Sequence, residues 1–174
     1  MLFLSILLGI LWAQIISHFG ASILLHRHYC HKQFSVPSWF ETMGLAMLMI
    51  AVIRSPIGWI ASHRMHHQHS DGPNDPHAPK HVGYWKVLTT TWTLPKIPAK
   101  YARDLYKNPK LVFCHKHWFK IVCIVWVVSF LISTYFFIAF ALVPFIFAKI
   151  GFGLLNTVGH GNGPLNVPWL NLFI

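Results

Sequence analysis

The chain has 174 residues, of which 55% are hydrophobic and 10% are charged, and its mean hydropathy is +0.50. Soluble domains carry about a quarter charged residues, so the composition excludes an ordinary soluble domain and indicates a membrane protein. Basic residues outnumber acidic ones by 14 to 4, giving a net charge of +10. A nucleic-acid-binding protein could carry this charge, but cations confined between two apolar segments would instead indicate a loop of a membrane protein.

Residues 1–25 predict a first membrane helix. They are long enough to span a bilayer, which takes about 20 helical residues. No basic segment precedes the apolar pattern and no small-residue cleavage site comes after it, so we expect a retained helix rather than a signal peptide. Gln14, His18 and Ser22 recur every four residues along it, and such a polar line either packs against another helix or borders a cavity.

Residues 38–54 predict an interfacial helix. Ser38 is a suitable N-cap, and the apolar residues after it are interrupted at Arg54, Pro56 and Gly58 before they reach a spanning length. We therefore expect a half-buried helix that returns the chain to the side it left. His26 and His63 would then lie on the same side of the membrane.

The run from His63 to His69 is the strongest chemical signal in the chain. His63, His66 and His67 are spaced at i, i+3 and i+4, so on a helix they share one face. By themselves they could be exposed helix histidines. His26 and His31 come earlier, however, and His160 comes later, which favours a shared metal site.

Residues 63–118 predict a cytoplasmic loop. Nine of the fourteen basic residues lie between Lys80 and Lys120, and a basic segment between apolar ones is typical of a loop that faces anionic headgroups. The three cysteines provide no disulfide framework, which also suits a reducing compartment. Tyr84, Trp85 and Trp118 resemble interfacial anchors, and we expect no nucleic-acid partner.

Residues 119–159 are about twice the length of one span and predict a hairpin of two membrane helices, at about 119–135 and 137–159, turning near Ser133. On the returning helix Lys149, Gly153, Asn156 and His160 form one stripe. Asn156 could bond to a neighbouring helix or serve a site. Two crossings place His160 on the same side as the earlier histidines.

Six converging imidazoles are too many for one tetrahedral zinc ion, so we expect two metals. With a single glutamate in the chain, the ligands must be rich in nitrogen, which suits iron, zinc or copper. The motif H-E-x-x-H of zinc proteases is absent.

The histidine motifs resemble those of the integral-membrane fatty-acyl desaturases, most closely the delta-9 type. His26 to His31 resembles the H-x4-H box, and His63 to His67 the H-x-x-H-H box. The segment from Ser70 to Trp85, with Asp75-Pro76-His77, is similar to the family segment immediately after the second box, and Asn156 to His160 is similar to a later segment that binds metal.

This resemblance implies an all-α, multi-pass membrane protein and an oxidoreductase that uses two non-haem iron ions, dioxygen and two electrons to introduce a cis double bond into an acyl chain. It implies an acyl substrate carried by CoA, a carrier protein or a lipid, and a separate electron donor, a ferredoxin or a b-type cytochrome. The implied metal ligands are His26, His31, His63, His66, His67 and His160, with Asn156 binding through water; His28 and His69 fall outside the boxes.

The chain departs from the family pattern in two ways. A third histidine box, expected downstream, does not occur before Ile174, and only one span fits before His26. We therefore expect residues 1–174 to form a single desaturase-like membrane domain truncated at its C-terminus, with the second iron site incomplete. The alternatives are a fatty-acyl or lipid hydroxylase of the same superfamily and a non-catalytic membrane metal-binding protein.

Overall fold

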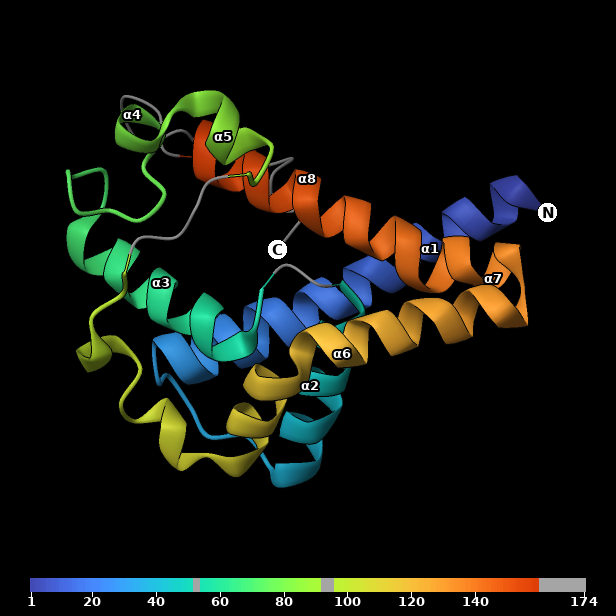
Figure 1. The fold of residues 1–174 in the computed structure, drawn as a ribbon, viewed down its shortest axis with the longest axis horizontal. Coiled ribbons are helices and arrows are strands. Elements are labelled where there is room, and N and C mark those ends of the chain that lie inside the picture. The colour runs from blue at the N-terminus through green and yellow to red at the C-terminus, as the bar shows by residue number, and fades with distance from the viewer. Residues whose placement is uncertain (52–53, 92–95, 160–174) are drawn as a thin grey trace.

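The computed structural model describes residues 1–51, 54–91 and 96–159, and these residues form helices and connecting segments, with no strand among them (Figure 1). The all-α prediction is confirmed for this part of the chain. The elements are, in order, α1 (Leu2–Ile15), η1 (Ile16–Cys30), α2 (Ser38–Ala51), α3 (Pro56–His69), α4 (Pro79–Val82), α5 (Tyr84–Leu88), η2 (Ala99–Tyr101), η3 (Leu105–Lys107), α6 (Pro109–Ile132), α7 (Thr134–Phe137), η4 (Ile138–Leu142) and α8 (Val143–Val158).

The first long helix is α1 continued by η1. Together they form one helix of 29 residues, Leu2–Cys30, and so extend past the expected end at residue 25. The η1 segment is wound as a π-helix, whose hydrogen bonds join residues five apart. The helix continues through the polar residues of the first histidine box because its backbone hydrogen bonds do not require apolar side chains.

The second and third helices, α2 and α3, meet at a bend of 90°. Ser55 caps α3 by accepting a hydrogen bond from the backbone N–H of Gly58 at 3.4 Å, and Pro56 occupies the first turn, a position that suits its fixed φ. His115 of α6 also contacts Ser55, with Nδ1 at 2.8 Å from Oγ. The start of the helix that carries the second histidine box is thereby attached to α6.

The long hairpin consists of α6 and the continuous helix α7–η4–α8. It turns at Ser133, whose side chain accepts hydrogen bonds from the backbone N–H groups of Tyr135 and Phe136. Helix α6 begins at Pro109 rather than near residue 119, because Asn108 caps it and Pro109 is its first residue. The described part of the region expected as a loop over 63–118 therefore contains half of α3, the short helices α4, α5, η2 and η3, and the first turns of α6.

Three helices within the described ranges are long and apolar enough to cross a membrane: Leu2–Cys30, Pro109–Ile132 and Thr134–Val158. The bent pair α2 and α3 would make a fourth span if it is counted as one. Large apolar side chains are exposed along α1 and α6, including Leu131, which is 77% exposed. Such surfaces suit contact with lipid, and the membrane-protein prediction agrees with these features.

The main core joins η1, α2, α3 and the N-terminal half of α6. It is built from buried side chains of those elements and of η3: Leu24, Leu25, Tyr29, Leu45, Leu48, Met49, Ile57, Trp59, Ile60, Leu105, Leu111 and Cys114. Leu24, Ile60 and Leu111 are completely buried. Because this core packs the end of η1 against α3, it brings the two histidine boxes to one place.

Helix α5 packs against α8 at Gly153, where Figure 1 shows the two helices side by side. A Cβ atom at this position would lie 1.9 Å from the carbonyl oxygen of Leu88. The close approach therefore requires glycine, and it holds the segment after the second histidine box against the last described helix.

We predict that Gly153→Ala separates α5 from α8 and lowers the free energy of unfolding by about 1–3 kcal/mol, the usual cost of overpacking. Thermal unfolding of the purified protein in detergent would measure the change. Ile150→Ala on the same helix is the matched control, since Ile150 is 48% exposed and surface changes have small effects. Equal stability of Gly153→Ala and the parent protein would contradict the prediction.

Candidate metal site

The π-helical winding of η1 aligns the first histidine box. On an α-helix, residues five apart point about 140° away from each other. In η1 the backbone N–H of His31 donates to the carbonyl of His26 at 3.0 Å, so five residues complete about one turn. His26 and His31 therefore lie on one face, and their Nε2 atoms are 3.0 Å apart.

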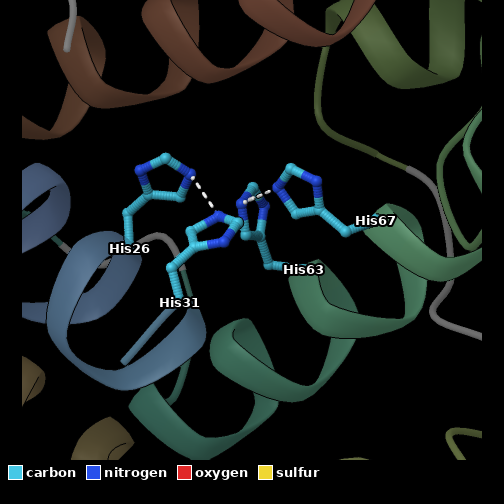
Figure 2. A group of neighbouring side chains, drawn as sticks. All are labelled: His26, His31, His63 and His67. Atoms are coloured by element: carbon cyan, nitrogen blue, oxygen red, sulfur yellow. Dashed lines mark hydrogen bonds between the residues drawn. The ribbon is translucent and has the colours of Figure 1, made fainter. Parts of the chain in front are cut away.

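The second box faces the first. His63 and His67, one turn apart on α3, have their Nε2 atoms 2.9 Å apart, and the ring centroids of His26 and His63 are separated by 4.8 Å. Figure 2 shows His26 on η1 and His31, the residue directly after η1, reaching toward His63 and His67 on α3. One ligand atom from each of the four histidines lies within 4.8 Å of the others.

This four-histidine cluster fits a nitrogen-bound transition metal. Two nitrogens at right angles on one ion, each about 2.1 Å from it, would lie about 3 Å apart, which matches both short nitrogen–nitrogen distances. Imidazole suits iron, zinc and copper. An unprotonated imidazole nitrogen binds such an ion through its lone pair.

The cluster borders a cavity of about 320 Å³ that lies between η1, α3 and α8. The lining is mixed: apolar side chains such as Trp59, Ala148 and Phe152 lie beside His26, His63, His66, His67 and Asn156. Trp59 stacks on His63, with ring centroids 4.8 Å apart and an angle of 14° between the ring planes. The cavity thus places apolar side chains directly beside candidate metal ligands.

His66 turns toward a different group from its neighbours. On a helix, His66 and His67 point about 100° apart, on either side of His63. His66 Nδ1 lies 2.7 Å from Asp75 Oδ2, and both residues are buried. The ring of His77 stacks on His66 at a centroid distance of 4.3 Å. The second box therefore divides between two neighbouring groups.

Asp75 is a fully hydrogen-bonded carboxylate. Besides His66, it accepts from the backbone N–H of Asp71 at 2.9 Å and of His77 at 3.0 Å. Burial opposes ionisation of Asp75, but these hydrogen bonds outweigh it and lower its pKa from 3.8 to about 2. An ionised Asp75 holds the proton of His66 on Nδ1, which leaves Nε2 of that ring as the atom able to bind metal.

Arg64 clamps the two boxes together. Its guanidinium donates to the carbonyl of Tyr29 at 2.6 Å and to that of Tyr101 at 2.9 Å. It also makes a two-pronged ion pair with Asp104, at 2.7 and 3.0 Å. The hydrogen bonds from Arg64 hold the pKa of Asp104 well below its usual range. Since Tyr29 lies between His26 and His31, this clamp joins the first box to the second.

The structure brings together four of the seven residues predicted as metal ligands. His26, His31, His63 and His67 form the cluster, and His66 lines the same cavity while it pairs with Asp75. Asn156 also lines the cavity, and its Nδ2 donates to the carbonyl of Phe152 on its own helix at 2.7 Å. His160 lies outside the described residues.

Sequence reasoning missed the roles of Asp75 and Arg64. The proline and glycine residues around Asp75 indicate a turn, and the only signal for another role is its place in Asp75-Pro76-His77, close after a histidine run. Arg64 lies inside the second box, where the pattern draws attention to the histidines around it. His28 lies outside the cluster, with Nδ1 at 2.8 Å from the carbonyl of Phe34.

Comparison with known proteins places these features in a family context. The Fatty acid desaturase family model matches residues 1–171. Delta-9 acyl-lipid desaturase 2 of Arabidopsis thaliana is 39% identical over 66 residues, which cover 38% of this chain and 21% of that protein. The sn-1 stearoyl-lipid 9-desaturase of Anabaena variabilis is 28% identical over 138 residues, covering 66% of this chain and 50% of that protein. The matches thus span half or less of these relatives' lengths.

We predict that His63→Ala weakens metal binding by more than the roughly 10–100-fold that loss of an outer partner produces. His63 Nε2 lies 2.9 Å from that of His67, and its ring centroid lies 4.8 Å from that of His26, so its loss removes one of the four ligands of the cluster. Metal content after loading with ferrous iron and buffer exchange would be measured by elemental analysis. His28→Ala is the matched control and should retain metal; equal loss in the two variants would contradict the assignment.

We predict that Asp75→Asn lowers metal affinity by about 10–100-fold, the effect of losing an outer carboxylate. The carboxylate of Asp75 accepts hydrogen bonds on two oxygens, whereas the amide of asparagine has only one oxygen that can accept. The hydrogen bond to His66 is therefore lost or weakened, and the ring loses its fixed orientation. Competition with a chelator would measure the affinity. Asp71→Asn is a matched control, because asparagine tolerates the positive φ of 60° found at Asp71. An unchanged affinity in Asp75→Asn would mean that Asp75 only supports its turn.

Proposed function

Because this chain belongs to the fatty acid desaturase family, we propose that it supplies the histidine site of a fatty-acyl desaturase that introduces a cis double bond into an acyl chain. The observation that carries the proposal is the four-histidine cluster beside a partly apolar cavity. Two relatives are named acyl-lipid and stearoyl-lipid desaturases, which favours a lipid-linked substrate over a CoA ester.

The proposed cofactor is a pair of iron ions. Histidine-bound iron supplies, with dioxygen and two electrons, an oxidant strong enough to remove hydrogen from an unactivated methylene. In this proposal His26, His31, His63 and His67 hold one ion. His66, oriented by Asp75, belongs to a second site together with His160 and, through water, Asn156.

The protein's own contribution is positioning and exclusion of water. Trp59, Ala148 and Phe152 provide an apolar wall for the methylene chain, and the adjacent histidines would hold the reactive centre close to it. A dry cavity protects a strong oxidant from side reactions. The position of the double bond would depend on how far the chain enters relative to the histidine cluster.

We further propose that the histidine site faces the cytoplasm and receives electrons from a separate ferredoxin or b-type cytochrome. The supporting observation is the concentration of basic residues between Lys80 and Lys120. A basic face attracts an acidic electron carrier and also suits the anionic inner leaflet.

Two other functions use the same cluster. A fatty-acyl or lipid hydroxylase would differ only in the fate of the activated substrate, and a metal-binding protein would bind iron without turnover. The cluster's position beside a cavity with an apolar wall favours the enzymes, because a metal store needs no such wall.

Product analysis tests the proposal. The protein at its full coded length, co-expressed with a ferredoxin and its reductase in a host that lacks unsaturated acyl chains, is expected to produce monounsaturated chains, detected by gas chromatography and mass spectrometry. The double variant His63→Ala/His67→Ala is the control and should produce none. Hydroxylated chains would instead favour the hydroxylase, and iron binding without either product would favour the metal-binding protein.

A further inference from the structure

A second groove lies between α2 and α6, which Figure 1 shows running beside each other. It encloses about 580 Å³ and is walled by apolar side chains that include Leu45, Ala46 and Met49 from α2 and Phe113, Ile121 and Val125 from α6. It shares no lining residue with the cavity at the histidines. The groove is therefore separate from the candidate metal site.

The length and setting of the groove suit a hydrocarbon chain. Its α6 wall extends from Pro109 to Val125, which is about 24 Å along a helix, compared with about 30 Å for the hydrocarbon core of a bilayer. Helix α6 is one of the candidate spans. Phe113 is 58% exposed, and Ala46 is exposed as well, so the groove opens to the surroundings of the helix.

One end of the groove is polar. A second hollow of about 430 Å³ adjoins it, since both are lined by Pro109 and Lys110. Among the residues lining this hollow, two are cationic, Lys107 and Lys110, and two are acidic, Glu41 and Asp104. Lys110 and Glu41 are paired with each other, and Asp104 is paired with Arg64. The exposed Lys107 is therefore the cation that a lipid phosphate would meet in this hollow.

Hydrogen bonds preorganise the walls of the polar hollow. Lys110 Nζ donates to the carbonyl of Ser38 at 2.8 Å, to its hydroxyl at 2.7 Å and to Glu41 at 2.9 Å. Asn108 Nδ2 donates to the same glutamate at 2.6 Å. These bonds hold the first turn of α2 against the first turn of α6, so a headgroup would meet a formed site rather than one it must order.

We infer that the α2–α6 groove binds a glycerophospholipid of the bilayer. One acyl chain lies along Ala46, Met49 and Ile121, and the phosphate of the headgroup lies in the hollow at Lys107. The bound lipid fills the space between α2 and α6. It thereby steadies α2, which leads into the bend before the histidines of α3.

Photocrosslinking tests this inference independently of any enzymatic activity. The protein would be reconstituted into nanodiscs with phosphatidylcholine that carries a diazirine in its acyl chain, and the adducts would be mapped by mass spectrometry. We expect adducts on α2 and α6 peptides that line the groove. Ala46→Phe, which fills the groove from an exposed position, is expected to lose most of this labelling.

The matched control is Val127→Phe, which adds the same ring to a position of α6 that is 57% exposed and outside the groove. It should keep the parent labelling, and both variants should keep the parent metal content, which separates blocking from misfolding. Equal labelling of the two variants would overturn the site. Equal labelling by a diacylglycerol probe, which lacks the phosphate, would overturn the assignment of the headgroup to the hollow at Lys107.

Discussion

The structure depends on the meeting of two helix segments, the last turn of η1 and the middle of α3. Imidazole nitrogens can bind one cation together only if each lies within a fraction of an ångström of its ligand position. Side chains on separate helices are held that precisely only when the helices are packed together. Buried contacts among Leu24, Ile57 and Ile60 bring the helices together. The Arg64 guanidinium on α3 then donates to the carbonyl of Tyr29 on η1, and the two-pronged ion pair with Asp104 fixes the direction of the guanidinium.

The same packing explains how a polar site exists within an apolar protein. Buried polar groups are costly unless they are hydrogen-bonded, and Asp75 meets this condition with three donors. On the cavity side the neighbouring surfaces are apolar, such as those of Trp59 and Phe152. The result is a group of nitrogen atoms with fixed orientations, facing a chamber suited to an acyl chain. This juxtaposition joins metal chemistry to a lipid substrate in the proposed function.

The cavity and the groove use the bent pair of α2 and α3 in different ways. Helix α3 presents histidines to the cavity, whereas α2 presents Ala46 and Met49 to the separate groove along α6. The bend of 90° between them permits this division, because each helix can face a different part of the molecule. Helix α5 packs against α8 at Gly153, which holds the segment after the second histidine box against α8.

The sequence by itself determined the helical class, the membrane setting, the family and the residues that could bind metal. These depend on hydrophobic length and histidine spacing, which are local properties. Helix boundaries were less accurate: Asn108 and Pro109 start α6 well before its apolar part, because a cap needs only local hydrogen bonds. Only the folded structure decided that π-helical winding aligns His26 with His31, and that His66 leaves its neighbours for Asp75. The first depends on the winding of the backbone, and the second depends on a contact between separate segments of the chain. The spacing of residues in the sequence specifies neither.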